Sequence, residues 1–194
     1  MPGVSWLQTL NNSSIDGTAL ANSTVATSLL PPIAKPTLPA NYFTSAGKLF
    51  KLRASGRIST VVTTPGTLTL DVRFGSVVVF NGGAMTLNIV AKTNVGWILD
   101  VDITVRAVGA TTTANVIGQG LWTSEAVIGG VAPTVGGATS HVLAYNTPPV
   151  VGTGFDSTAA FTVDLFGTWS VANAANSITC HQFALIDMNM GASA

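Results

Sequence analysis

The sequence predicts an all-β protein, an antiparallel jelly-roll-like β-sandwich behind an extended, proline-rich N-terminal arm. Three observations lead to this prediction. Apolar and polar residues alternate with a period of two over several stretches, as they do in strands that bury one face. Glycine and proline turns separate these stretches, and no core-helix pattern stands out among them. About eight stretches of this kind match the two packed sheets of a jelly roll.

The alternation is clearest at 67–74, 97–108 and 161–165, where every second residue is apolar and most residues between are Thr, Asp or Arg. Further strands are expected at Lys48–Ser59, Ser76–Phe80, Met85–Val90, Asn115–Trp122, Val142–Tyr145 and Ser177–Met188. Asn81–Gly82, between two of them, is a strong hairpin signal. Some strand faces that should be polar also carry apolar residues (Ile98, Val108, Phe166, Phe183 and Leu185). These residues are either buried by a second sheet, the arm or a neighbouring subunit, or they are ordinary exposed apolar surface.

Residues 1–46 are predicted to form an arm and linker ahead of a β-sandwich domain at 47–194. Prolines favour extended backbone and are excluded from helix interiors, and four of them punctuate this segment (Pro31, Pro32, Pro36 and Pro39). The spacing of Leu20, Val25 and Leu29 favours one short helix within 17–30. Far from the arm, the Gly- and Pro-rich stretch 129–149 is expected to be a long loop, and such loops often contact a partner.

Trp6, followed by Leu7 and Leu10, is predicted to make subunit contacts. A large apolar side chain on an extended arm has no core of its own, so it packs either on a neighbouring subunit or on its own domain. The four prolines of the arm would orient it. These seven residues form the predicted subunit-contact site.

Charge is scarce: only 8% of the 194 residues are charged, against roughly 25% in an average soluble domain. The formal net charge is zero, and the five basic residues between Lys35 and Arg57 are too sparse for a nucleic-acid-binding surface. We expect neither a transmembrane helix nor a signal peptide. A chain with so little charge must cover apolar surface by another route, and assembly of many copies is the simplest one.

No motif predicts catalysis, a cofactor or a metal site, so we expect the protein not to be an enzyme. Asp100 and Asp102 share a strand face with Arg106, which favours an ion-paired surface over acid–base chemistry. Cys180 lies in an apolar run and is expected to be a buried hydrophobe, with His181 on the opposite strand face. Core packing is the expected role of most large aromatic residues (Trp97, Trp122, Trp169 and Tyr145).

An uncharged β-domain rich in Thr, Gly, Ala and Val behind a proline-rich arm resembles the structural proteins of tailed-phage virions. The stretches Gly47–Ser59, Thr67–Phe74 and Trp97–Val108 carry this resemblance, which covers residues 47–194 in style. The proteins it resembles are capsid decoration (cement) proteins and head or tail accessory proteins. The resemblance implies a non-enzymatic protein, often a trimer, that binds between major capsid protein subunits through an arm or loop.

The leading hypothesis is a virion structural protein, assembled in the host cytoplasm, that stabilises a phage capsid as a decoration subunit. Its expected partners are further copies of itself, as a homo-oligomer and most simply a trimer, and the major capsid protein or other virion proteins. Nucleic acid, membrane and cofactors are not expected. One alternative is a tail, neck or fibre-attachment protein. The other is a carbohydrate-binding β-sandwich, which predicts that Trp122 and Trp169 lie exposed on one sheet face.

Overall fold

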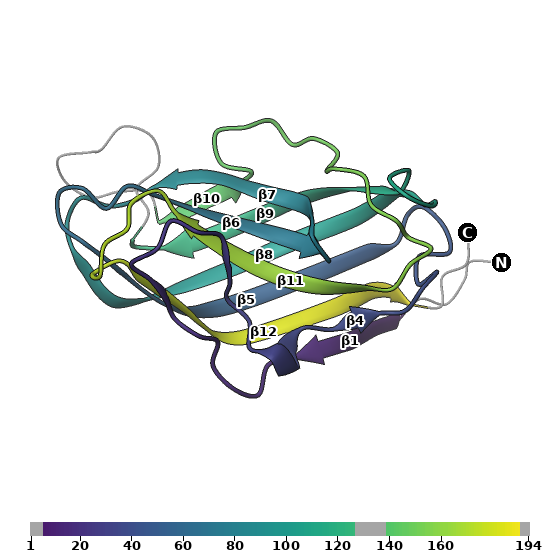
Figure 1. Cartoon of the computed structure of the whole chain (residues 1–194), viewed down its shortest axis with the longest axis horizontal. Coiled ribbons are helices and arrows are strands. Elements are labelled where there is room, and N and C mark those ends of the chain that lie inside the picture. The colour runs from purple at the N-terminus through teal and green to yellow at the C-terminus, as the bar shows by residue number, and fades with distance from the viewer. Residues whose placement is uncertain (1–5, 127–138, 191–194) are drawn as a thin grey trace.

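The computed structural model describes residues 6–126 and 139–190, which form two facing antiparallel sheets (Figure 1). Within these ranges the chain has twelve strands, one 3₁₀ turn, η1 (Pro32–Ala34), and no α-helix. The predicted antiparallel sandwich is therefore confirmed.

The larger sheet has seven strands and the smaller has five. The larger is ordered β1 (Trp6–Asn12), β12 (Ser177–Met190), β5 (Leu49–Thr60), β8 (Lys92–Ala107), β9 (Asn115–Ser124) and β10 (Ser140–Leu143), with β2 (Leu20–Ala21) also on β12. The smaller is ordered β3 (Thr27–Ser28), β11 (Phe161–Trp169), β6 (Thr67–Phe74) and β7 (Val77–Thr86), with β4 (Thr37–Leu38) also on β11. Consecutive strands β6 and β7 are neighbours in one sheet, as are β8 and β9, and this order does not confirm a jelly roll.

The core lies between the sheets and is built from the inward residues of the alternating strands. In β8, Trp97 and Leu99 are buried while Ile98 between them is 42% exposed, as the period of two predicts. Trp97 stacks on Trp122 of the neighbouring strand, with ring centroids 5.2 Å apart. A second aromatic cluster joins the arm segment to the smaller sheet and the 144–160 connection (Phe43, Phe74, Phe155 and Phe161).

The N-terminal segment up to residue 46 follows the sandwich closely. Its strands β1 and β2 pair with β12, and its strands β3 and β4 pair with β11. Several of its apolar side chains are buried in the shared core (Leu20, Leu29, Leu30, Ala34, Leu38 and Phe43). The division of the chain into an arm and a domain at residue 46 stays a prediction.

The short helix expected within 17–30 is wrong, because this segment forms the bridging strands β2 and β3 instead. Leu20 and Leu29 do enter the core, but each does so from a short extended piece that pairs with a long strand. Gly17 lies so close to Leu29 that a Cβ at this position would collide with the Leu29 carbonyl oxygen. Tertiary pairing therefore outweighs a loose helical spacing here.

The hairpin expected at Asn81–Gly82 is also wrong. β7 runs without interruption from Val77 to Thr86, and the chain reverses before it, at Gly75. The register of β7 against β6 shifts beside Asn81, so the glycines there belong to a β-bulge. Gly83 has a φ of 76°, and its N–H donates to Asn81 Oδ1 at 2.9 Å. Turns and bulges both use glycine at positive φ, which explains the ambiguity.

A second bulge explains the apolar residues of β12 that seemed to face the wrong way. The register of β12 against β5 shifts between Cys180 and Gln182. Cys180 before the shift and Phe183 and Leu185 after it are all buried. One extra residue thus keeps both halves of the strand facing the core. The loop expected at 129–149 lies partly outside the described residues, and its described part includes β10.

Candidate functional site

Three of the seven predicted subunit-contact residues, Trp6, Leu7 and Leu10, lie on β1, an edge strand of the larger sheet (Figure 1). Trp6 is 54% exposed and Leu7 is 64% exposed, whereas Leu10 is half-buried against the core. β1 pairs with β12 on one side, and within the described parts of the chain no strand pairs with its other side. None of its seven residues is charged. The edge strand therefore offers two large apolar side chains to a partner.

Of the four prolines of the predicted contact site, Pro36 attaches the chain to the smaller sheet, and the other three accept hydrogen bonds within local turns. Pro36 accepts a hydrogen bond from Val163 N–H in β11 at 2.9 Å, just before β4 begins. Pro31 is buried and precedes η1, while Pro32 and Pro39 are exposed. The prolines are thus placed along β11, and Trp6 and Leu7 along β12. Asn11 Nδ2 donates to the Ile33 carbonyl at 3.2 Å, which links the end of β1 to η1.

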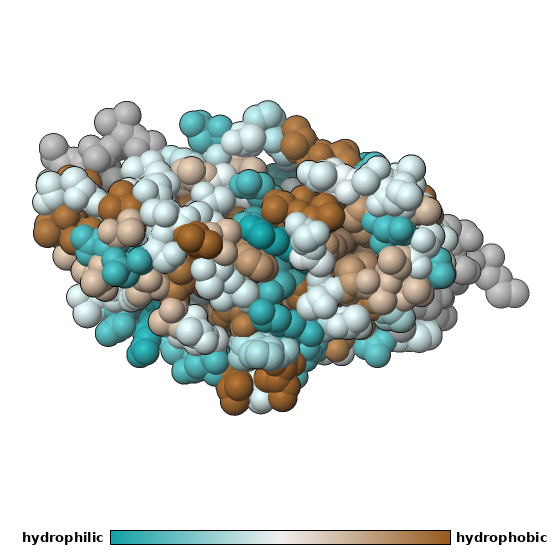
Figure 2. All heavy atoms as spheres, viewed as in Figure 1, coloured by the Kyte–Doolittle hydropathy of each residue, from teal (hydrophilic) through white to brown (hydrophobic). Residues whose placement is uncertain are grey.

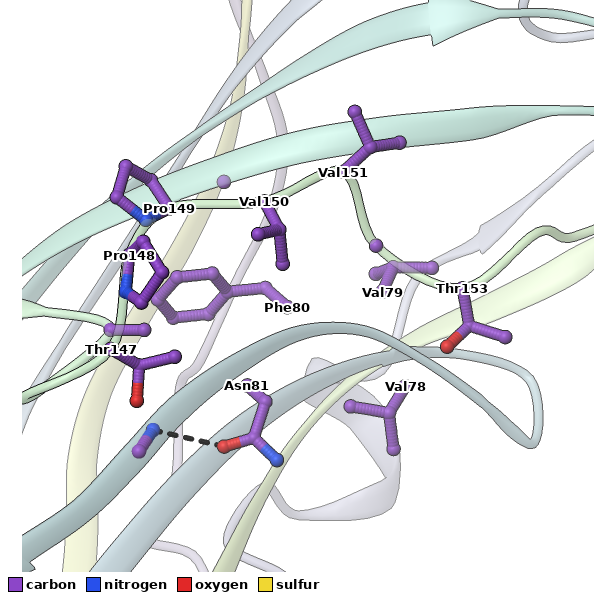
Figure 3. A pocket seen from close by; sticks show the side chains of 14 residues that line it. Val78, Val79, Phe80, Asn81, Thr147, Pro148, Pro149, Val150, Val151 and Thr153 are labelled. Atoms are coloured by element: carbon purple, nitrogen blue, oxygen red, sulfur yellow. Dashed lines mark hydrogen bonds between the residues drawn. The ribbon is translucent and has the colours of Figure 1, made fainter.

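A groove of about 490 Å³ lies between β7 and the segment 144–153 (Figure 3). Both of these elements lie on the side of the molecule opposite β1 (Figure 1). Its lining comes from β7, from Gly118 of β9 and from that segment (Val78, Val79, Phe80, Asn81, Gly83, Gly118, Ala144, Thr147, Pro148, Pro149, Val150, Val151, Gly152 and Thr153). No lining residue is charged. This volume lies within the range of small-molecule sites, about 300–1,000 Å³.

Segment 144–153 is fixed at both ends and stands away from the sheet between them. Tyr145 N–H donates to the Gly82 carbonyl at 2.7 Å, and Gly152 N–H donates to the Val116 carbonyl at 2.7 Å. Between these attachments the chain carries Pro148 and Pro149, whose rings lie near the Phe80 ring in Figure 3. Proline fixes the backbone angle φ, so segment 144–153 loses little further conformational entropy when it binds a partner.

Phe80 reaches the groove because a glycine lies behind it. A Cβ on Gly118 would approach the Phe80 ring to 2.6 Å, too close for any side chain. Phe80 itself is 5% exposed, so it provides a floor, while Val150 is 64% exposed at the rim. The groove thus has an apolar floor at Phe80 and an apolar rim that includes Pro148, Pro149 and Val150. Thr147, Thr153 and Asn81 add hydroxyl and amide groups to its lining.

The tryptophans proposed as a sugar platform do not form one. Trp122 is 0% exposed and Trp169 is 1% exposed, because both lie on inward faces of their sheets. The predicted core packing of Trp97, Trp122 and Trp169 is confirmed, and Tyr145 packs partly against the core. A flat, exposed aromatic pair is absent from the positions where the carbohydrate-binding alternative required it.

The charged residues singled out in the sequence form cross-strand ion pairs. Lys51 lies 3.4 Å from Asp102, and Arg53 lies 3.7 Å from Asp100, between β5 and β8 on the outer face of the larger sheet. This confirms the predicted ion-paired surface, although Arg106 is not in these two pairs. Lys35 pairs with Asp164 at 3.0 Å, which ties the N-terminal segment to β11. Much of the sparse charge is therefore satisfied within the chain.

Cys180 and His181 point to opposite faces of β12, as predicted. Cys180 is buried, and burial raises the pKa of its thiol from its ordinary value near 9 to about 12. A protonated, enclosed thiol is a poor nucleophile at neutral pH. His181 Nδ1 lies 2.8 Å from Asp16 Oδ1 at the surface. Residues 6–126 and 139–190 contain no cluster of three or more His, Cys, Asp or Glu side chains arranged to hold a metal ion.

Sequence reasoning missed a buried polar cluster on β12. Asp187 is fully buried, accepts a hydrogen bond from the Tyr42 hydroxyl at 2.8 Å, and pairs with Lys48 at 2.9 Å. Burial, together with the hydrogen bond to Asp187, raises the pKa of Tyr42. The signal in the sequence was a lone acid within the apolar run from Phe183 to Met188.

No family model matches the sequence, and no curated protein matches it. Among solved structures, the chain is similar to the CBM2 module of the evolved Dit of Lactobacillus casei BL23 phage J-1. The TM-score is 0.35 and the sequence identity is 11%, over 82% of this chain and 70% of that chain. A similarity this distant does not establish a shared function. In the described part of the chain, no helix has the length and apolar character needed to span a membrane.

Proposed function

We propose that this chain is a non-enzymatic structural protein of a phage particle, which binds the capsid as a decoration subunit and strengthens it. The supporting observation is the uncharged edge strand β1, which leaves Trp6 and Leu7 more than half exposed. The connection to phage particles rests on the compositional resemblance, and the capsid as partner follows from that resemblance. The proposal includes assembly in the host cytoplasm and self-association, most simply as a trimer.

The physical basis of the proposal is apolar burial repeated over many copies. Each apolar Å² removed from water contributes roughly 25 cal/mol, and a standard interface buries about 1,600 Å² in total. Loss of rigid-body freedom offsets much of this gain in a single contact. In a closed shell each subunit makes several contacts at once, so weak contacts act together. Internal ion pairing, as at Lys35–Asp164, leaves less charge to be stripped of water.

The tail, neck or fibre-attachment alternative uses the same surface and differs in copy number. The carbohydrate-binding alternative lacks its predicted platform, since Trp122 and Trp169 are buried. No observation on the described residues favours it over a structural role.

The test is to quantify the chain by mass spectrometry in purified particles produced from the genome that encodes it. The proposal expects a copy number comparable with that of the major capsid protein. A small, ring-like copy number would replace the capsid by the tail or neck. Absence of the chain from the particles would refute a virion role. Light scattering of the purified chain at several concentrations then measures its native mass, and a stable trimer is the expected result.

A further inference from the structure

We propose that the uncharged groove between β7 and segment 144–153 receives the Trp6 side chain from a second copy of this chain, with the adjacent Leu7, on the other face of the strand, at the groove rim, so that copies join head to tail. This inference rests on the proposed function, and it deepens that function by naming both sides of one subunit contact. The exposed Trp6 of one copy and the uncharged groove of another, both formed by described residues, would then cover each other.

The inserting side is the start of β1. Trp6 and Leu7 are adjacent, large and more than half exposed, and the strand that carries them has no charged residue. Its register against β12 shifts between Trp6 and Gln8 and again between Thr9 and Asn11. Bulges of this kind keep an edge strand from pairing with another sheet edge. The side chains of β1, rather than its backbone, are therefore the groups available for a contact.

The receiving side matches these side chains in charge and in character. The groove has about 490 Å³ of space, an apolar floor at Phe80 and no charged lining residue. Entry of the indole ring would thus strip no ion of its water, and the loss of water around an ion is the largest cost that burial can carry. The indole N–H would need an acceptor, and Asn81 and Thr147 place polar groups at the same groove. A charged peptide, by contrast, would find no counterion there.

The placement of the two sides excludes insertion within one copy. β1 lies along one edge of the molecule, and β7 and the connection from β10 to β11, which line the groove, lie at the opposite edge (Figure 1). Figure 2 shows apolar residues at the upper edge, over the connection from β10 to β11. Contact between two different surfaces of identical copies is heterologous, and it closes into a ring or continues as an open array. Both outcomes suit a repeated particle lattice.

The experiment uses the full-length chain and three single variants. Trp6→Ala removes the inserting side chain, and Val150→Glu places a charge on the groove rim. Val25→Glu is the matched control, because Val25 is 69% exposed and Val150 is 64% exposed. Sedimentation and light scattering over a range of concentrations measure self-association, and cooperative thermal unfolding shows that each variant is folded. We expect Trp6→Ala and Val150→Glu to weaken self-association about tenfold or more, and Val25→Glu to leave it unchanged.

Mixing the two weakened variants is the decisive measurement. The Trp6→Ala copy keeps an intact groove, and the Val150→Glu copy keeps an intact Trp6, so one good contact remains between them. The mixture should form a one-to-one pair that neither variant forms alone. In a Cys180→Ala background, a Leu7→Cys copy mixed with a Val150→Cys copy should also give a cross-linked pair with a short thiol-reactive linker.

Three results would overturn the proposal. A mixture that fails to recover pairing would show that Trp6 and the groove do not meet. A wild-type chain that stays monomeric up to millimolar concentration would show that no such contact forms. Saturable binding of a neutral oligosaccharide that Val150→Glu abolishes and Trp6→Ala does not, with no effect of either variant on native mass, would assign the groove to a sugar. Detection of the chain in purified particles would keep the virion role in each of these cases.

Discussion

At the scale of single residues, the most demanding feature is the buried carboxylate of Asp187. Its side chain is 0% exposed and that of its partner Lys48 is 11% exposed. A buried charge is tolerated only when it is paired and hydrogen-bonded, and the Tyr42 hydroxyl adds a hydrogen bond. The cluster ties the segment just before β5 to β12. Residues 42–48 are therefore fixed where the N-terminal segment meets the first long strand.

The substitution Asp187→Asn should destabilise the protein by about 3–5 kcal/mol, because it leaves the charge of the buried Lys48 ammonium without its carboxylate partner. Urea unfolding followed by tryptophan fluorescence measures this change. Asp102→Asn is the matched control: this carboxylate is 56% exposed and pairs with Lys51 at the surface, where such pairs contribute about 0–1 kcal/mol. Equal losses in the two variants would contradict the assigned role of burial.

At the scale of structural elements, close backbone contacts set the shape of the groove. β7 has two register shifts against β6, one on each side of Phe80 and Asn81. At these irregular points segment 144–153 approaches the strand, through Tyr145 at one end and Gly152 at the other. A Cβ on Gly152 would collide with the Val79 carbonyl oxygen. The bulges and the glycine together create both the attachment points and the space between them.

Gly152→Ala should therefore lift one end of segment 144–153 and destabilise the protein by about 1–3 kcal/mol. Gly96→Ala, in β8, is the control, because a Cβ at Gly96 meets nothing within 4 Å. Thermal unfolding reports the stability, and the self-association assay reports the groove. We expect Gly152→Ala to impair both, and Gly96→Ala to impair neither. An unchanged melting temperature for Gly152→Ala would show that the segment is not attached as described.

At the scale of the whole molecule, the first and last described strands pair in one sheet. β1, near the start, pairs with β12, near the end, and β12 also pairs with β5 at the centre of the fold. The two parts of the N-terminal segment contribute differently to stability. β1 leaves most of its side chains exposed, whereas Leu20, Leu29 and Leu30 are buried in the core. Gly17, whose N–H donates to the Cys180 carbonyl at 2.8 Å, marks the change.

Deletion of residues 1–12 should leave a cooperatively folded sandwich, at a cost of about 1–2 kcal/mol for the lost strand and for Leu10. Deletion of residues 1–30 should abolish cooperative unfolding, because each buried leucine contributes about 2–5 kcal/mol and total stabilities are only about 5–15 kcal/mol. Circular dichroism and thermal unfolding distinguish the two truncated chains. If both truncated chains unfold cooperatively with similar midpoints, the division at Gly17 is wrong.

The period-two alternation determined the fold class by itself, since it specifies which side chains of β6, β8 and β11 can be buried together. It also placed Trp97 on a core face, and Asp100 and Asp102 on the opposite face with Arg106. These are local properties of strands: a side chain at i and one at i+2 share a face wherever the strand is placed.

Only the tertiary structure decided the roles of the glycines, the N-terminal segment and Asp187. Asn81–Gly82 has the local chemistry of a turn, and pairing with β6 makes it part of a bulge. The apolar residues of 17–46 have no strong period, and they are buried because β11 and β12 offer partners far away in sequence. The groove likewise joins β7, β9 and segment 144–153, and no local pattern records their proximity. Long-range pairing free energy, which outweighs local preference, is the physical reason for each of these outcomes.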